Sequence, residues 1–356
     1  YRDEMKKEIP ELDAVVGIGS NGKICDIIRE ILLDKQAVCS YGAKTELSME
    51  GGRIISTEPF YAYIKIAEGC SNNCTYCAIP SIRGKYRSRR MEDIVKEARW
   101  LAENGVTELV VVAQDTTRYG EDIYGKSMLP ELLTALCEID GFKWIRTLYC
   151  YPERITDELL DVIAKEDKLV KYLDMPIQHC NKTILKRMNR HGDRETLTAL
   201  IKKIREKIPN VTLRTTLITG FPGETEEQFE ELCEFVKEIR FERLGCFAYS
   251  PEEGTPAEKF EDQVPLKDRE RRAEIIMEEQ MIISDSLNEA ALDSEVEVVC
   301  EGFDRYAECY YGRSQADAPE IDGKIFFLSE DKVRVGEYVK VKIDDTMDYD
   351  LIGSKM

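Results

Sequence analysis

The chain has 356 residues and a formal net charge of −19, from 50 basic and 69 acidic residues. Hydrophobic residues make up 43% and charged residues 33%, which is typical of a globular protein with two or three domains and excludes a disordered chain. The acidic balance argues against a protein built to lie along nucleic acid, and no apolar run approaches the roughly 18–20 residues that span a bilayer.

The first 40 residues show a helix, a short strand and a second helix. An apolar run predicts the strand at residues 12–18, and apolar periodicity predicts the second helix at residues 24–33. These elements cannot bury both of their faces alone, so we interpret residues 1–40 as the end of a domain whose beginning is missing. Residues 41–58 are polar and glycine-rich, which predicts a linker.

From residue 60, apolar runs alternate with amphipathic helical patterns. We expect strands at residues 62–67, 109–113, 144–149, 171–175, 212–219 and 244–249, and helices at residues 91–103, 129–138, 157–165, 194–207 and 225–238. This alternation predicts an α/β fold with a parallel sheet and outer helices. Six strands are too few for a closed eight-stranded barrel, so we expect an open partial (β/α)6 barrel over residues 59–292. Its chemistry should lie at the carboxyl ends of the strands.

A charged helix at residues 266–292 ends this alternation. Residues 293–356 then show short alternating strands, at 295–300, 306–312, 323–327 and 338–343, which predict a small antiparallel β-barrel. This segment holds 16 acidic and 8 basic residues, a local net charge of about −8. An acidic barrel does not suit RNA but complements a basic protein.

The sequence holds twelve cysteines, of which nine are scattered singly and are expected to act mostly as small buried hydrophobes. The other three, Cys70, Cys74 and Cys77, follow the first expected strand with C-x3-C-x2-C spacing. No export signal precedes them, so we expect a cytoplasmic protein whose clustered cysteines bind metal. Structural zinc needs four ligands, whereas three thiolates suit a 4Fe-4S cluster with one open iron. An incomplete zinc site is the alternative.

Six long segments carry a family resemblance: EGCSNNCTYCAIPSIRGKYRSR, VVAQDTTRYGEDIY, LYCYPERIT, DMPIQHCNKTILKRMNR, RTTLITGFPGETEEQFEEL and FAYSPEEGTPA. The cysteine loop resembles that of the radical S-adenosylmethionine (SAM) superfamily. Together the segments resemble the methylthiotransferases, from about residue 12 to the C-terminus, and the terminal barrel resembles their TRAM module. Gln114-Asp115-Thr116-Thr117 and Gln178-His179 resemble the RimO-type branch. That branch modifies an aspartate of small-subunit ribosomal protein twelve, and the alternative branch modifies a tRNA adenosine.

The resemblance implies that Cys70, Cys74 and Cys77 hold a 4Fe-4S cluster whose open iron binds SAM. An external electron donor reduces this cluster, and the resulting 5′-deoxyadenosyl radical removes hydrogen from the aspartate β-carbon. The family binds a second, sulfur-donating 4Fe-4S cluster through three cysteines of an N-terminal domain. Cys25 and Cys39 do not match those positions, so we expect an N-terminally truncated chain without these ligands. A non-catalytic, ribosome-binding adaptor is a third hypothesis.

Weaker features supply further cofactor-binding candidates. Gly220 and Gly223 lie in a GFPGET turn, where Thr225 and Gln228 predict a capping box and the glycines would let the backbone approach SAM. A basic run stands out in this acidic chain, at Arg83, Lys85, Arg87, Arg89 and Arg90. It is interpreted either as a solvated face or as a contact with the SAM carboxylate, the target aspartate or ribosomal RNA. Tyr76, Gln114, Asp115 and Gln178 are candidates to line the cavity, whereas His179 is interpreted first as a structural histidine.

Overall fold

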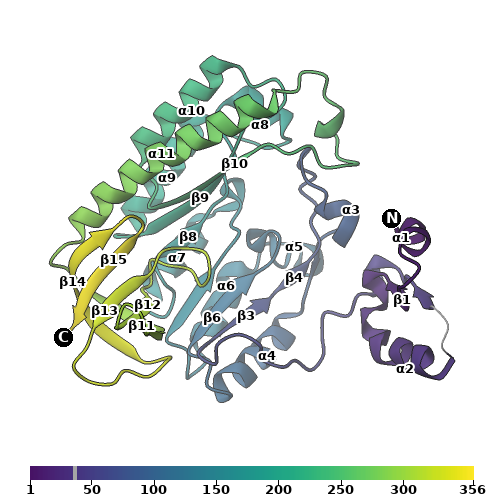
Figure 1. Ribbon diagram of the computed structural model, residues 1–356, viewed down its shortest axis with the longest axis horizontal. Coiled ribbons are helices and arrows are strands. Elements are labelled where there is room, and N and C mark those ends of the chain that lie inside the picture. Colours follow the sequence, from purple (N-terminus) through teal and green to yellow (C-terminus); the bar gives the residue numbers. More distant parts are fainter. Residues whose placement is uncertain (35–37) are drawn as a thin grey trace.

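The N-terminal lobe is visibly separate from the rest of the molecule in the computed structural model, which describes residues 1–34 and 38–356 (Figure 1). The predicted domain at residues 1–40 therefore includes three residues, 35–37, that lie outside the described residues. The lobe consists of α1 (Arg2–Glu8), β1 (Ala14–Val16), α2 (Ile24–Asp34) and β2 (Val38–Ser40), and β1 pairs in parallel with β2. Apart from one 3-10 turn at Lys44–Glu46, residues 41–58 contain no helix or strand.

Six parallel strands form the central half-barrel. They are β3 (Tyr61–Lys65), β6 (Glu108–Val112), β7 (Trp144–Thr147), β8 (Tyr172–Asp174), β9 (Thr212–Thr219) and β10 (Arg243–Ala248). Two three-stranded sheets, β3-β6-β7 and β8-β9-β10, are joined by a bridge between Ile145 and Leu169. The strands follow one another in chain order with β3 and β10 at the edges, which confirms the predicted open (β/α)6 arrangement.

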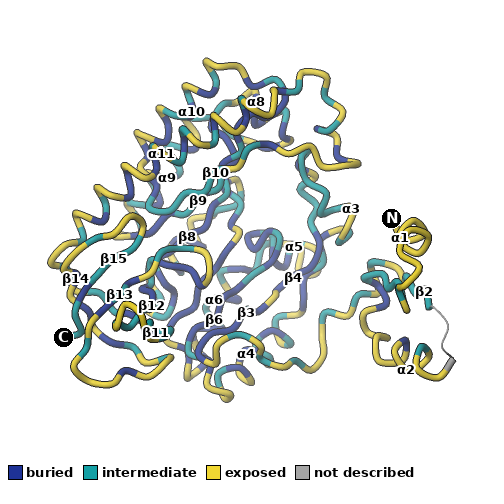
Figure 2. Tube along the Cα trace, in the orientation of Figure 1, coloured by how far each residue is buried: buried dark blue, intermediate teal, exposed yellow. Residues whose placement is uncertain are grey.

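Helices cover the outer face of these strands (Figures 1 and 2). The long ones are α4 (Met91–Glu103), α6 (Leu129–Cys137), α7 (Asp157–Lys165), α9 (Arg194–Lys207), α10 (Glu226–Ile239) and α11 (Leu266–Ala290). Shorter elements are β4 (Ala67–Glu68), α3 (Ile79–Arg83), β5 (Arg87–Ser88), α5 (Glu121–Tyr124) and α8 (Lys182–Arg187). Leu109 and Val111 of β6 are fully buried in one cluster with Leu132 and Leu133 of α6. No helix in the described part is both long and apolar enough to cross a membrane.

The terminal segment forms a closed barrel with the strand order β11-β12-β13-β15-β14. Its strands are β11 (Glu295–Asp304), β12 (Cys309–Arg313), β13 (Ile325–Leu328), β14 (Tyr338–Met347) and β15 (Asp350–Lys355). The expected antiparallel barrel had four strands, whereas the structure adds β15, which pairs in parallel with β13. The sequence DLIGSK of β15 has only two apolar residues and a glycine, so its alternation is weak, and its strand state depends on closing the barrel.

Candidate functional site

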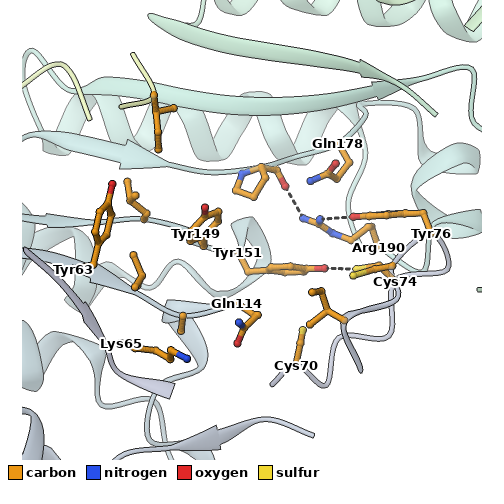
Figure 3. A pocket seen from close by; sticks show the side chains of 17 residues that line it. Tyr63, Lys65, Cys70, Cys74, Tyr76, Gln114, Tyr149, Tyr151, Gln178 and Arg190 are labelled. Carbon is orange, nitrogen blue, oxygen red and sulfur yellow. Dashed lines mark hydrogen bonds between the residues drawn. The ribbon is translucent and has the colours of Figure 1, made fainter. Parts of the chain in front are cut away.

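A cavity of about 590 Å³ lies inside the half-barrel, where residues at the carboxyl ends of β3, β6, β7 and β8 converge (Figure 3). Lys65 ends β3, Gln114 follows β6, Tyr149 and Tyr151 follow β7, and Gln178 follows β8. Parallel strands bring their carboxyl ends to one edge of a sheet, which is where α/β proteins bind their ligands. The cavity therefore lies where the strand pattern predicts the chemistry.

The three clustered cysteines all line this cavity. Cys74 is buried, and Cys70 and Cys77 are half-buried. In the described part of the chain, no three Cys, His, Asp or Glu side chains lie close enough together to hold one metal ion. A single zinc ion requires ligand atoms about 2.0–2.3 Å from one point, whereas a cubic cluster gives each thiolate its own iron. Three thiols from one loop that line one cavity can each bind one iron of such a cluster.

A buried carboxylate holds the start of the cysteine loop. The fully buried side chain of Glu68 accepts hydrogen bonds from Arg83 Nε (2.7 Å), Lys65 Nζ (2.8 Å) and the Gly69 amide (2.9 Å). Burial alone would raise the pKa of Glu68, but these hydrogen bonds lower it to about 2. Arg83, a predicted cofactor ligand, does not line the cavity. Its position favours a role in holding the loop, and cofactor binding by Arg83 stays a prediction.

The end of β6 holds the middle of the same loop. Asp115 is fully buried and accepts a hydrogen bond of 2.8 Å from Asn72 Nδ2. Asn189, after α8, donates to the carbonyl oxygens of Asn72 (3.1 Å) and Asn73 (3.0 Å). Asp115, predicted as a possible lining residue, is not in the cavity wall but positions the loop that carries the cysteines.

Tyr151 and Arg190 form a polar wall beside Cys74 (Figure 3). The Tyr151 hydroxyl lies 2.8 Å from Cys74 Sγ, and the Arg190 guanidinium lies 3.8 Å from the centre of the Tyr151 ring. Arg190 also donates to the Pro176 carbonyl oxygen at 3.0 Å and reaches the Tyr76 hydroxyl at 3.5 Å. Burial raises the pKa of Tyr151 well above its ordinary value, so the phenol stays protonated and can donate to sulfur.

The cavity also contains backbone and polar features typical of binding sites. Tyr149 and Gln178 have φ angles of 60° and 69°, a left-handed conformation that is uncommon for residues other than glycine and that clusters at functional sites. Among the residues that the structure describes, the buried side-chain oxygen of Gln114 has no hydrogen-bond partner. A buried acceptor of this kind requires a donor, which a bound ligand can supply. Tyr76, Gln114 and Gln178 all line the cavity, as expected of cofactor-binding candidates.

The two candidate glycines lie outside the cavity wall. Their φ angles are 66° at Gly220 and 82° at Gly223. An added Cβ at Gly220 would lie 2.4 Å from Arg269 Cγ, so the absence of a side chain lets α11 approach this turn. The predicted capping box of Thr225 and Gln228 at the start of α10 is confirmed. Contact of either glycine with SAM stays a prediction.

His179 and two arginines of the basic run have partners within the protein. His179 is fully buried outside the cavity, and its Nδ1 accepts a hydrogen bond of 2.9 Å from the Asn181 amide. Burial, with a smaller effect of Arg272, lowers the pKa of His179 to about 3, so it is neutral and structural. Arg87 donates to the carbonyls of residues 44 and 45, and Arg89 pairs with the carboxylate of residue 50 at 2.6 Å. These two arginines therefore hold the predicted linker, and are not a solvated face.

The sequence pattern indicates no role for four residues that line the cavity, namely Lys65, Tyr149, Tyr151 and Arg190. The last three lie within segments quoted for the family resemblance. Tyr149 is the last residue of an expected strand, and Tyr151 lies two residues after it. That strand-end position was the available signal for the two tyrosines. Nothing in the local pattern indicates that Arg190 returns to the cavity after α8.

Residues 64–236 match the Radical SAM superfamily, and residues 294–355 match the TRAM domain. The chain is 48% identical to the ribosomal protein uS12 methylthiotransferase RimO of Clostridium tetani, over 99% of this chain and 79% of that protein. The RimO protein of Clostridioides difficile is 50% identical over the same shares. Among solved structures, the radical SAM methyltransferase TsrM from Kitasatospora setae has a TM-score of 0.50 at 16% identity, covering 66% of this chain and 52% of that chain. This last likeness shows the fold alone.

Proposed function

The chain belongs to the RimO family of ribosomal protein uS12 methylthiotransferases, and from this we propose that it acts on an aspartate β-carbon of uS12. It is a radical SAM enzyme that transfers a sulfur-containing group. The observation that carries the proposal is the shared position of Cys70, Cys74 and Cys77 in one cavity at the strand ends. The tRNA-modifying and adaptor hypotheses are not favoured by these relatives.

In this proposal the three cysteines hold a 4Fe-4S cluster that binds SAM. Held by Cys70, Cys74 and Cys77, a reduced cluster would supply the electron for reductive cleavage of SAM. We propose that Tyr76, Gln114 and Gln178 contact SAM, which their presence in the wall of the same cavity supports. The aromatic and aliphatic side chains of the wall, such as Tyr63 and Leu148, exclude water and limit the C–H bonds within reach of a reactive carbon.

The charge of the terminal barrel supports a protein substrate. Its 16 acidic and 8 basic residues give about −8, which complements a basic ribosomal protein and repels a phosphate backbone. We propose that the protein works in the cytoplasm, where ribosomes are, with an external electron donor.

We further propose that the cysteines of this chain hold one cluster. Cys25 and Cys39 are exposed in the N-terminal lobe, and neither lines the cavity. The sulfur-donating cluster of the family is therefore not assigned to these residues. The expected iron content is about four per chain. We expect this chain alone to form 5′-deoxyadenosine but no methylthiolated product, because methylthio transfer also needs the second, sulfur-donating cluster of the family.

The test is anaerobic reconstitution with iron and sulfide, followed by an iron count and electron paramagnetic resonance with and without SAM. The reduced protein is then incubated with uS12 deuterated at aspartate β-carbons, and deuterium is sought in the 5′-deoxyadenosine. We expect deuterium transfer, loss of iron in Cys74→Ala, and retention of iron in the control Cys309→Ala, a cysteine of the barrel. Absence of iron, or deuterium taken from labelled tRNA adenosine instead, would overturn the proposed function. About eight irons, or a methylthiolated product from this chain alone, would overturn the one-cluster proposal.

A further inference from the structure

The segment that joins β12 to β13 leaves the terminal barrel and enters the half-barrel. We define residues 313–322 as the floor loop. Each of the six strands of the half-barrel makes a polar contact to it: Tyr61 to Glu320 (3.0 Å), Glu108 to Arg313, Arg146 to Gln315 (2.9 Å), Tyr172 to Asp322 (2.6 Å), Arg214 to Asp322 (3.5 Å) and Arg243 to Asp317 (2.6 Å). Four of these strand residues are the first of their strand, namely Tyr61, Glu108, Tyr172 and Arg243. The floor loop therefore lies toward the amino ends, on the opposite side from the cysteine loop.

Buried groups fix the conformation of the floor loop. The side chains of Arg313, Asp317 and Asp322 are 2%, 4% and 4% exposed. Within the loop, Asp317 accepts hydrogen bonds from the amide and hydroxyl of Ser314, and Asp322 accepts from the Ala318 amide. A loop held by contacts from six strands and from its own buried carboxylates has one favoured position.

Ile321 is the residue of this loop that reaches the catalytic cavity. It is the one lining residue contributed by the terminal barrel domain within the part of the chain that the structure describes. It also lines a second cavity of about 440 Å³, whose other lining residues include Arg214, Arg243, Gln280 and Asp350. Ile321, which is 42% exposed, thus lies at the boundary between the cavity that contains the cysteines and a second cavity lined by several charged side chains.

We infer that the floor loop is part of the active site, and that Ile321 bounds the space in which the acceptor carbon of the substrate lies. The inference rests on the proposed function for the identity of that substrate. An aliphatic side chain at this position keeps the charged cavity, and the water that charged groups hold, apart from the reacting centre. The TRAM-like domain then sets the depth of the catalytic cavity in addition to any role in docking.

The position of Ile321 is testable without a cofactor. In the metal-free protein, Ile321→Cys should be linked to Cys70 or Cys77 by a bis-maleimide whose span matches the cavity, with the linked peptides identified by mass spectrometry. The control is Leu328→Cys, because Leu328 is an exposed aliphatic residue of the same domain that does not line the cavity. Absence of the link at residue 321, or an equal yield at residue 328, would overturn the inference.

The functional test compares Ile321→Ala, the volume-conserving Ile321→Leu and the control Leu328→Ala in the reconstituted protein. The readout is the fraction of 5′-deoxyadenosine that carries deuterium from labelled uS12. We expect this fraction to fall at least threefold in Ile321→Ala, while iron content and the rate of SAM cleavage stay at parent values. Ile321→Leu and Leu328→Ala should match the parent. An unchanged fraction in Ile321→Ala contradicts the inference, whereas absence of transfer in the parent contradicts the proposed function and leaves the cross-linking result to judge Ile321.

Discussion

The carboxylate of Glu68 provides a measurable link between the cysteine loop and folding stability. Its side chain is fully buried and is hydrogen-bonded to Arg83, Lys65 and the Gly69 amide. Burial opposes ionisation, but these partners lower the pKa from 4.5 to about 2. The difference between these pKa values corresponds to about 3 kcal/mol of folding free energy at neutral pH.

Glu68→Gln keeps the shape of the side chain and removes its charge. We expect the free energy of unfolding at pH 7 to fall by about 2–3 kcal/mol, since a neutral amide keeps part of the hydrogen bonding. The folded pKa lies below the unfolded pKa, so the contribution is complete above about pH 5 and is lost as the pH falls toward 2. The gap between parent and variant should therefore narrow by about 2 kcal/mol between pH 7 and pH 3.

The assay is urea unfolding of the metal-free proteins, followed by circular dichroism from pH 7 to pH 3. Glu103→Gln is the matched control, because Glu103 is an exposed residue at the end of α4 with no ion pair in the described part of the chain. We expect that control to stay within about 0.5 kcal/mol of the parent at each pH. A gap for Glu68→Gln that stays constant with pH would refute the assigned role of the ionised carboxylate.

Three further substitutions examine the rest of the site. Tyr151→Phe removes the hydroxyl 2.8 Å from Cys74 Sγ, so the reconstituted cluster should have a lower midpoint potential in a titration followed by paramagnetic resonance; an unchanged potential contradicts this. Arg190→Lys loses the flat contact with the Tyr151 ring and should slow SAM-dependent 5′-deoxyadenosine formation about tenfold or more while retaining iron; parent-like rates would exclude such a role. Gly220→Ala, at a φ of 66° and against Arg269, should cost about 1–3 kcal/mol in thermal unfolding; an unchanged melting temperature would show that the turn relaxes.

Local pattern was sufficient for most elements of the fold. The bounds of β9, α4 and α7 were predicted to the residue because each has a clear period and a turn or cap at its ends. The sequence pattern does not predict the strand β15, because its few apolar residues do not alternate clearly and its strand state depends on pairing with β13 and β14. Its parallel pairing with β13 depends on the closure of the barrel, which no local signal specifies.

The sequence predicts the part of the candidate site whose residues lie close together along the chain. The spacing of Cys70, Cys74 and Cys77 identified the loop because all three residues lie on one short segment. The sequence predicts Gly220 in a turn, and the structure confirms the turn. The sequence does not show that this turn packs against Arg269 of α11, because that contact depends on the tertiary fold. Arg190 and Ile321 reach the cavity from elements distant in the chain, and only the tertiary fold brings them there.

The ion pairs between the terminal barrel and the half-barrel fix the relative position of these two domains more than they stabilise the fold. Glu108 is fully buried between Arg146 and Arg313, with Arg146 Nε at 3.1 Å. A buried ion pair adds little net stability relative to well-packed apolar residues. Loss of one partner, however, lowers the free energy of unfolding by about 3–5 kcal/mol, because the other charge stays buried and unpaired. Such a network therefore penalises every arrangement of the two domains except one. Since Ile321 completes the cavity wall from the barrel side, this single arrangement is what the geometry of the active site requires.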